Sequence, residues 1–203
     1  MAGLFVSFEG IDRSGKTTQA RMLCDALGER CVAVRDPGGT EVGERLRSLL
    51  KDPAVELSPQ AEALLFAAAR AESVDRVIRP ALAAGCVVVS DRYVDSSLAY
   101  QGEGRGLGIE EVARVNEWAV GGLTPDLTFL LVLPPGAAAE RGAEDDRFES
   151  EGAGLQVRVH DAYDRRADAA PRRWRRVVAD RPADVVHAEV LGIVEAALSQ
   201  VPA

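Results

Sequence analysis

Residues 3–19 read GLFVSFEGIDRSGKTTQ, in which a short apolar run leads into a loop bounded by glycines. Residues 4–8 have the length and apolar character of a buried strand, and residues 10–17 match the pattern G-x-x-x-x-G-K-[ST]. Loops of this pattern wrap phosphate groups when they join a strand to a helix, because their glycines let backbone N–H groups approach the phosphate closely. A chance glycine-rich turn is the alternative, but the complete pattern in this context favours an NTP-binding α/β domain.

The loop supplies a candidate nucleotide-binding residue at every position. Lys16 is expected to reach the terminal phosphates, and the hydroxyl of Thr17 is expected to ligate Mg²⁺. The predicted nucleoside triphosphate site comprises Gly10, Ile11, Asp12, Arg13, Ser14, Gly15, Lys16 and Thr17, and the loop alone does not distinguish a GTPase, a motor-type ATPase or a small-molecule kinase. A loop that holds polyanions gains nothing from a carboxylate, so the ligand of Asp12 is an open question at this point.

Apolar runs of strand length alternate with helical patterns along the chain. The runs lie at residues 4–8, 31–34, 86–89, 127–133 and 176–179, and the helical patterns at 16–27, up to 50, 59–84, from 93, 109–120, up to 168 and from 182. Strands that are apolar on both faces are typical of a parallel sheet covered by helices on both sides. The chain has 203 residues, so we expect one three-layer α/β domain over residues 1–203 with a parallel five-stranded sheet.

Composition narrows the class of partner. The chain carries 24 Lys and Arg against 32 Asp and Glu, a net charge of −8, which argues against nucleic-acid or membrane surfaces as partners. No apolar run reaches the roughly 18 residues of a membrane helix, and no basic flank or cleavage site precedes the first strand, so a cytoplasmic location is expected. Cys24, Cys31 and Cys86 lack metal-ligand spacing and are expected to be reduced, buried residues.

A second strand end carries charged residues that suit phosphate chemistry. The stretch CVVVSDRY at residues 86–93 ends its apolar run at Asp91, which resembles a Walker B carboxylate for Mg²⁺. Arg92 follows directly, and a guanidinium can hold a second phosphate group through two N–H donors. The alternative is that Asp91 and Arg92 are an ordinary pair of charged surface residues after a strand. Ligands of open α/β sheets bind at the carboxyl ends of strands, which favours the functional interpretation.

Six segments together carry a resemblance to a known family. They are FEGIDRSGKTTQ at 8–19, RDPGGTEVGERLRSLL at 35–50, LLFAAAR at 64–70, SDRYVDSSLAYQG at 90–102, TPDLTFLLVLPP at 124–135 and DDRFE at 145–149. In this order and spacing the chain resembles the thymidylate kinases from about residue 3 to residue 165. The resemblance implies a P-loop kinase fold with a short lid, and phosphoryl transfer from ATP to dTMP that gives ADP and dTDP for dTTP biosynthesis.

The resemblance also implies an acceptor site. It places the dTMP phosphate on Arg92, the thymine against Phe66 and Arg70, and the sugar 3′-hydroxyl on Asp12. The implied dTMP-binding residues are Asp12, Pro37, Phe66, Arg70, Arg92, Ser97, Tyr100 and Gln101. Phe66 and Arg70 are four residues apart in a helical pattern and so share a face, and a donor such as Arg70 favours thymine over cytosine. A core Phe66 beside a solvated Arg70 is the alternative.

The implied catalytic group combines the loop with a mobile lid. It consists of Lys16, Arg13, Asp91, Arg92 and Arg147, with Mg²⁺ held by Thr17 and Asp91. The lid corresponds to about residues 141–153, where Arg147 matches better than Arg141. Relatives carry a basic residue either at the position of Arg13 or in the lid, whereas this chain has both. We expect both arginines to contact the transferring phosphate.

Other interpretations remain open. A kinase of the same architecture acting on another nucleotide or a nucleoside is one, and a nucleotide-binding protein that has lost transfer activity is another. The run RRWRR at residues 172–176 suggests nucleic-acid binding less than a solvated face or an edge near the adenine pocket. Relatives are commonly homodimers, and the alanine-rich helix from Pro59 offers a packing face, although an apolar stripe is first of all a core stripe.

Overall fold

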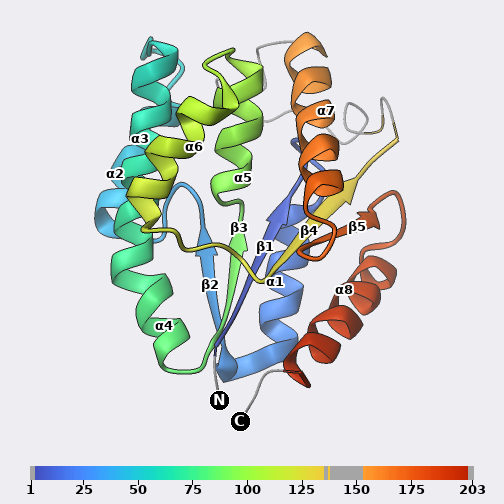
Figure 1. Cartoon of the computed structure of the whole chain (residues 1–203). Coiled ribbons are helices and arrows are strands. Elements are labelled where there is room, and N and C mark those ends of the chain that lie inside the picture. Colours follow the sequence, from blue (N-terminus) through green and yellow to red (C-terminus); the bar gives the residue numbers. More distant parts are fainter. Residues whose placement is uncertain (1–2, 135–136, 138–152, 201–203) are drawn as a thin grey trace.

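A single parallel sheet organises the protein. The computed structural model describes residues 3–134, 137 and 153–200. Within them, five parallel strands form one sheet in the order β2-β3-β1-β4-β5 (Figure 1). The strands are β1 (Leu4–Glu9), β2 (Cys31–Arg35), β3 (Val87–Asp91), β4 (Leu127–Val132) and β5 (Trp174–Val178). The predicted five-stranded parallel α/β fold is confirmed. A single domain over residues 1–203 stays a prediction.

Helices cover both faces of the sheet because β1 is apolar on both faces. Leu4, Val6 and Phe8 pack in one core with α1 (Lys16–Leu27) and α8 (Ala183–Leu198). Phe5 points to the other face and packs there with Val74, Ile78 and Val120. The remaining helical elements are α2 (Glu41–Lys51), α3 (Pro59–Ser73), α4 (Arg79–Ala83), α5 (Val94–Ser97), α6 (Ile109–Val120) and α7 (Ala153–Ala169), with a 3₁₀ turn η1 (Gly28–Arg30) and π-helical segments η2 (Val74–Ile78) and η3 (Leu98–Gly104). The three-layer arrangement follows from this two-sided burial.

The helix predicted over residues 59–84 begins as expected but changes its winding. Ser58 Oγ accepts a hydrogen bond from the N–H of Ala61 at 3.3 Å, and Pro59 opens α3. After α3 the chain forms the π-helical segment η2 and then α4, which contains Pro80. Proline has no N–H and crowds the carbonyl four residues earlier, so a regular α-helix cannot continue through it.

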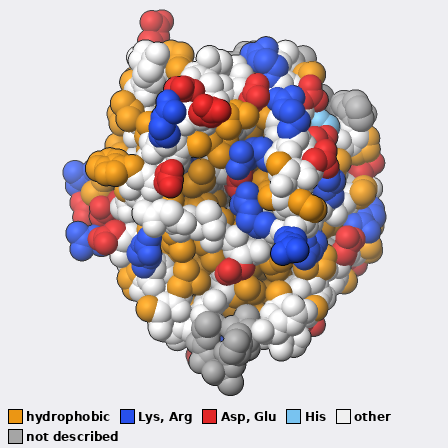
Figure 2. All heavy atoms as spheres, viewed as in Figure 1, with side chains coloured by type: hydrophobic (Ala, Val, Ile, Leu, Met, Phe, Trp, Pro, Cys, Tyr) orange, Lys and Arg blue, Asp and Glu red, His pale blue; other side chains and the backbone are white. Residues whose placement is uncertain are grey.

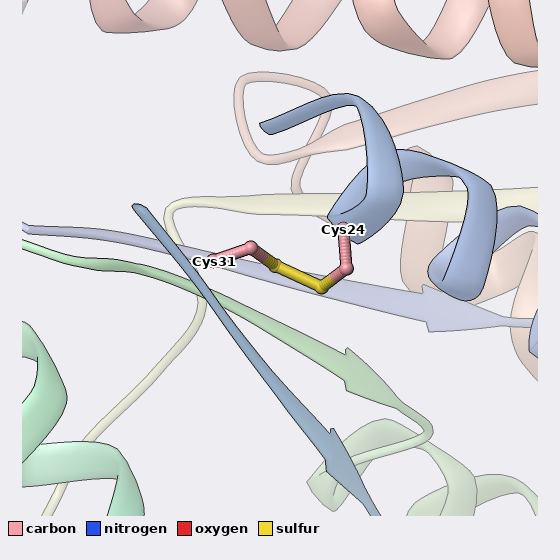
Figure 3. The surroundings of a disulfide bond; sticks show 2 residues. All are labelled: Cys24 and Cys31. Carbon is pink, nitrogen blue, oxygen red and sulfur yellow. A yellow bond between two sulfur atoms is a disulfide. The ribbon is translucent and has the colours of Figure 1, made fainter. Parts of the chain in front are cut away.

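The expectation of reduced, buried cysteines is wrong: two of the three form a disulfide, and none of the three is fully buried. Cys24 of α1 and Cys31 of β2 form a disulfide, with their Cα atoms 5.2 Å apart (Figure 3). Helix α1 ends at Leu27 and η1 reverses the chain, so the helix and the next strand meet through these two side chains. Cys86 is a free thiol, and all three cysteines are only half-buried.

The arginine-rich run serves the packing of the last strand. Strand β5 begins at Trp174, two residues before its predicted start, so the run lies partly in a turn and partly in the sheet. Arg173 donates to the buried Asp95 at 2.6 Å, and Arg176 donates to Asp168 at 2.8 Å. In the described part of the chain, no helix combines the length and apolarity needed to cross a membrane.

Candidate active site

The candidate site lies at the carboxyl ends of three adjacent strands. Asp91 is level with Phe8 of β1 and with Arg35 of β2 in the sheet register. The phosphate loop follows β1, Arg92 follows Asp91, and Asp36 and Pro37 follow β2. Strand β1 lies between β3 and β4 in the sheet. After β1 the chain first adds strands β2 and β3 on one side of β1, and then adds β4 and β5 on the other side. Such a change of direction opens a crevice at the carboxyl edge, where α/β proteins bind ligands.

The phosphate loop has the backbone geometry that its glycines permit. Gly10 has φ 139°, and a Cβ there would lie 2.7 Å from the carbonyl oxygen of Leu131. Gly15 has φ 95° directly before α1 and has no side chain to cap it, so the first N–H groups of α1 are available to an anion. The strand–loop–helix context predicted from the sequence is therefore present.

Lys16 lies over this loop. Its Nζ donates to the carbonyl of Ile11 at 2.6 Å and to Ser14 Oγ at 3.3 Å. Burial, together with the nearby charge of Arg92, lowers the pKa of Lys16 to about 8. Neighbouring carboxylates, of which Asp12 has the largest effect, oppose this lowering of the pKa. A phosphate group in the loop would favour the charged ammonium.

The two predicted magnesium ligands are in contact. Thr17 Oγ1 donates to Asp91 Oδ2 at 2.5 Å. A hydroxyl and a carboxylate are hard oxygen ligands of the kind that Mg²⁺ prefers, and Mg²⁺ in kinases completes its shell with water and phosphate oxygens. Among the described residues, no group of three or more His, Cys, Asp or Glu side chains could hold a metal ion. The pair of Thr17 and Asp91 fits an ion that arrives with a nucleotide, because phosphate oxygens and water supply the remaining ligands of Mg²⁺ in such sites.

Asp12 faces Arg92 from the loop. Its carboxylate forms an ion pair with Arg92 and accepts hydrogen bonds from Tyr100 Oη at 3.0 Å and from Gln156 Nε2 at 3.2 Å. Burial alone raises the pKa of Asp12, but Arg92 and Lys16, helped by these hydrogen bonds, hold it below its ordinary value. The carboxylate is therefore ionised and is directed at the strand end that carries Arg92.

Arg70 is buried, which excludes the alternative of a solvated surface residue. Its side chain is 1% exposed, and Nε donates to Asp36 Oδ2 at 2.7 Å. Nη2 donates to Ser97 Oγ at 3.1 Å, and Nη1 donates to Asn116 Oδ1. Phe66 is half-buried one turn earlier on the same face of α3. The carbonyl of Pro37, on the neighbouring loop, accepts from Arg47 Nη1 at 2.9 Å.

Tyr100 and Gln101 lie on η3 and meet different partners. Tyr100 Oη reaches Asp12 of the loop, and its ring lies 5.0 Å from the Arg92 guanidinium carbon. Gln101 is buried, and its Nε2 donates to Glu62 Oε1 of α3 at 2.8 Å. The structure therefore brings every predicted site residue outside the lid to one edge of the sheet and the helices above it.

Sequence reasoning missed several residues of this region. Glu9 accepts from the N–H of Tyr93 at 2.8 Å, from Ser96 Oγ at 2.6 Å and from Tyr163 Oη at 2.9 Å. Burial, with the nearby Asp95, raises the pKa of Glu9 to about 7. A charged residue at the end of an apolar strand was the available signal for Glu9, whereas Gln156 and Tyr163 belong to no motif.

The predicted lid over about residues 141–153 lies outside the described residues up to Ala153, where α7 begins. Arg147 and Arg141 are therefore also outside them. Figure 2 shows Lys and Arg side chains gathered near the centre of the face viewed in Figure 1, which agrees with a local positive site on a chain of net charge −8.

The fold and the site define a P-loop phosphotransferase: a phosphate loop after the first strand and a carboxylate–arginine pair at the end of the strand beside it. The model of the thymidylate kinase family matches residues 8–190. The chain therefore belongs to the thymidylate kinase family.

Similar proteins agree with this assignment over nearly the whole chain. A thymidylate kinase of Pelotomaculum thermopropionicum is 47% identical, with 98% of this chain and 95% of the relative covered. One of Lactobacillus helveticus is 41% identical, with 99% and 100% covered. The crystal structure of thymidylate kinase from Ehrlichia chaffeensis has a TM-score of 0.80 at 31% identity, covering 96% of this chain and 99% of that one.

Proposed function

We propose that this enzyme transfers the terminal phosphoryl group of ATP to dTMP, giving ADP and dTDP. The observation that carries the proposal is the contact between Asp12 of the phosphate loop and Arg92 of the neighbouring strand end. A loop suited to one nucleotide therefore adjoins a cation suited to the phosphate of a second. Phosphoryl transfer mainly requires that the two phosphate groups be positioned next to each other and that their negative charge be neutralised.

The loop and its neighbours are assigned to ATP. Backbone N–H groups of residues 10–17 cradle the phosphates, and Lys16 turns from the carbonyl of Ile11 to the terminal phosphates. Thr17 and Asp91 would hold Mg²⁺. When bound, Mg²⁺ neutralises charge on the phosphate oxygens. Arg13 and Arg147 both contact the transferring phosphate in this proposal.

The residues above the sheet edge are assigned to dTMP. Arg92 holds the acceptor phosphate, and Asp12 accepts the sugar 3′-hydroxyl. Arg70 donates to a thymine carbonyl while Phe66 stacks on the ring, since Asp36 and Ser97 already hold the guanidinium in place. Pro37, Ser97, Tyr100 and Gln101 line the nucleoside, with Tyr100 near the sugar 2′ position.

An ADP-release assay over an acceptor panel tests the proposal. We expect dTMP to be the best acceptor among dTMP, dUMP, dCMP, AMP and thymidine, with ATP as donor. Preference for another member would assign the chain to a different acceptor. Binding of ATP and dTMP without ADP formation would revive the alternative of a protein that has lost transfer activity.

We also propose a homodimer in the cytoplasm. Exposed apolar side chains on three neighbouring helices support the dimer: Val42 of α2, Leu64 of α3, which is 56% exposed, and Trp118 of α6, which is 87% exposed. Single apolar side chains on a surface are common, but three on adjoining helices suit an interface. Sedimentation of the wild type and of Leu64→Glu tests the dimer, and a monomeric wild type would contradict it.

A further inference from the structure

We propose that Glu62 is a positioning residue that fixes the orientation of the Gln101 side-chain amide and thereby contributes to selection of the acceptor base. This inference rests on the proposed function, because it concerns the base of the acceptor nucleotide. Neither the phosphate loop nor the strand ends contain Glu62.

Glu62 shares a helix face with the two residues assigned to the base. Glu62, Phe66 and Arg70 follow one another at intervals of four residues in α3, so their side chains lie on one face. Glu62 is only 1% exposed, which is unusual for a carboxylate unless it is paired and hydrogen-bonded. Burial of a charge on the face that carries Phe66 and Arg70 indicates a role within the site.

The partners of Glu62 hold both of its oxygens. Gln101 Nε2 donates to Oε1 at 2.8 Å, and Arg105 Nε donates to the same oxygen at 3.1 Å. Arg105 Nη2 donates to Oε2 at 2.8 Å. Arg105 lies at the end of η3, where its N–H donates to the carbonyl of Tyr100 at 2.8 Å. The ion pair therefore ties the carboxylate to the segment that carries Gln101.

A carboxylate dictates which end of the Gln101 amide faces it. An ionised carboxylate only accepts hydrogen bonds, so the NH₂ group of Gln101 must lie toward Glu62 and the carbonyl oxygen must lie away from it. Since Arg105 holds the carboxylate in place, the amide cannot reverse without leaving a buried donor and a buried acceptor mispaired. Gln101 is thereby set as a hydrogen-bond acceptor.

Two cross-links of opposite hydrogen-bonding character join α3 to the helix that runs from α5 into η3. Arg70 donates to Ser97, and Gln101, one turn after Ser97, donates to Glu62. Phe66 lies between Arg70 and Glu62 on α3. In this proposal Arg70 supplies a guanidinium donor and Gln101 supplies an amide oxygen to a base stacked on Phe66.

This combination matches an imide edge, in which a carbonyl acceptor adjoins an N–H donor, as in thymine and uracil. The corresponding edge of cytosine has an amino donor beside a ring-nitrogen acceptor, so both partners would be mispaired. Because mispairing of buried polar groups is costly, the fixed amide adds to the selection made by Arg70.

The test substitutes Glu62→Gln and measures kcat/KM with ATP for dTMP, dUMP and dCMP. An amide at position 62 can donate or accept, so the Gln101 amide is free to reverse. We expect the preference for dTMP over dCMP to fall about tenfold, the effect of one hydrogen bond. The preference for dTMP over dUMP should stay unchanged, because these two bases share the imide edge. If Glu62 had only a structural role, Glu62→Gln would not change the dTMP-to-dCMP ratio while leaving the dTMP-to-dUMP ratio unchanged.

Three further variants serve as controls for this result. Glu41→Gln removes an exposed i,i+4 ion pair with Arg45 on α2 and should leave both ratios at their wild-type values. The double variant Glu62→Gln with Gln101→Glu exchanges the two side chains. The amide at position 62 then donates to the carboxylate at position 101, and the second carboxylate oxygen at position 101 is directed at the base. This double variant should regain most of the preference over dCMP. Should Glu62→Gln yield little folded protein, Glu62→Asp, which draws the carboxylate back by one methylene, is judged by the same two ratios.

An unchanged dTMP-to-dCMP ratio in folded Glu62→Gln, or an equal loss toward all three acceptors, would overturn the positioning role. Failure of the wild type to phosphorylate dTMP would instead refute the proposed function. The two failures are thus distinguishable in one set of assays.

Discussion

Tyr163 of α7 donates a hydrogen bond to the buried carboxylate of Glu9 at 2.9 Å, across 154 residues of sequence. Ser96 Oγ donates to the same carboxylate, and the oxygens of Ser96 and Tyr163 in turn accept from Arg92 Nη1 at 3.1 and 3.3 Å. Glu9 therefore accepts hydrogen bonds from the two hydroxyl groups that orient Arg92.

Titration of Glu9 should make stability depend on pH. Its pKa is about 7 in the folded protein against 4.5 for the ordinary side chain, so the folded state retains a proton that the unfolded state has released. The free energy of unfolding should therefore fall as pH rises from about 4.5 to 7, by about 3 kcal/mol from this group. Glu9→Gln does not titrate and should lack this part of the pH dependence.

Denaturant unfolding of wild type and Glu9→Gln from pH 4.5 to 8 isolates this effect, because other groups cancel in the difference. The advantage of the wild type over the variant should shrink as pH rises and level off above pH 7. A difference that does not change with pH would refute the raised pKa.

Asp12 should make the enzyme sensitive to the sugar 3′-hydroxyl. With wild type, a 3′-deoxy analogue of dTMP should show a kcat/KM about tenfold below that of dTMP, because the partly buried carboxylate of Asp12 loses a donor. With Asp12→Ala the two acceptors should differ by less than about twofold. If the analogue reacted like dTMP with both proteins, Asp12 would have no part in binding the 3′-hydroxyl.

The two candidate arginines for the transferring phosphate should each affect turnover. We expect Arg13→Ala and Arg147→Ala each to lower kcat by about 100-fold, since each removes charge stabilisation of the transition state. Steady-state kinetics at saturating ATP and dTMP measure this. An intact kcat for Arg147→Ala beside a lost kcat for Arg13→Ala would demote Arg147 to binding or structure.

Arg173 should stabilise the fold more than its neighbour in the same run. It pairs with Asp95, which is 2% exposed and also pairs with Arg166 of α7. Arg173→Met should cost about 3 kcal/mol of unfolding free energy, because it leaves a buried carboxylate short of a partner. Arg172 is exposed, so Arg172→Met should change stability by less than about 0.5 kcal/mol. Equal effects in denaturant unfolding would contradict this assignment.

The disulfide should contribute to stability although it closes a short loop. Cys24 and Cys31 are seven residues apart, for which loop-closure entropy corresponds to about 2 kcal/mol. Dithiothreitol should lower the unfolding free energy of wild type by this amount and should not change that of Cys24→Ser. Cys86→Ser serves as the control and should respond to dithiothreitol as wild type does. A wild type insensitive to the reductant would argue against the bond.

Local patterns were sufficient for the architecture. Strands apolar on both faces predicted the parallel sheet, and Ser58 with Pro59 predicted the start of α3, because these signals depend on neighbours in sequence. The π-helical turn at η2 and the earlier start of β5 were not predicted, since boundaries depend on packing as well as on propensity. The pairing of Cys24 with Cys31 required the reversal of the chain at η1.

The sequence by itself determined the strand–loop–helix unit of residues 4–27, the charged residues at the strand ends, and the shared helix face of Phe66 and Arg70. Only the tertiary structure decided what those residues face: Asp12 toward Arg92, Arg70 toward Asp36, Gln101 toward Glu62 and Glu9 toward Tyr163. The reason is physical. A repeating pattern specifies which side of an element is buried, whereas the pairing of buried charges depends on distances between elements that are remote in sequence.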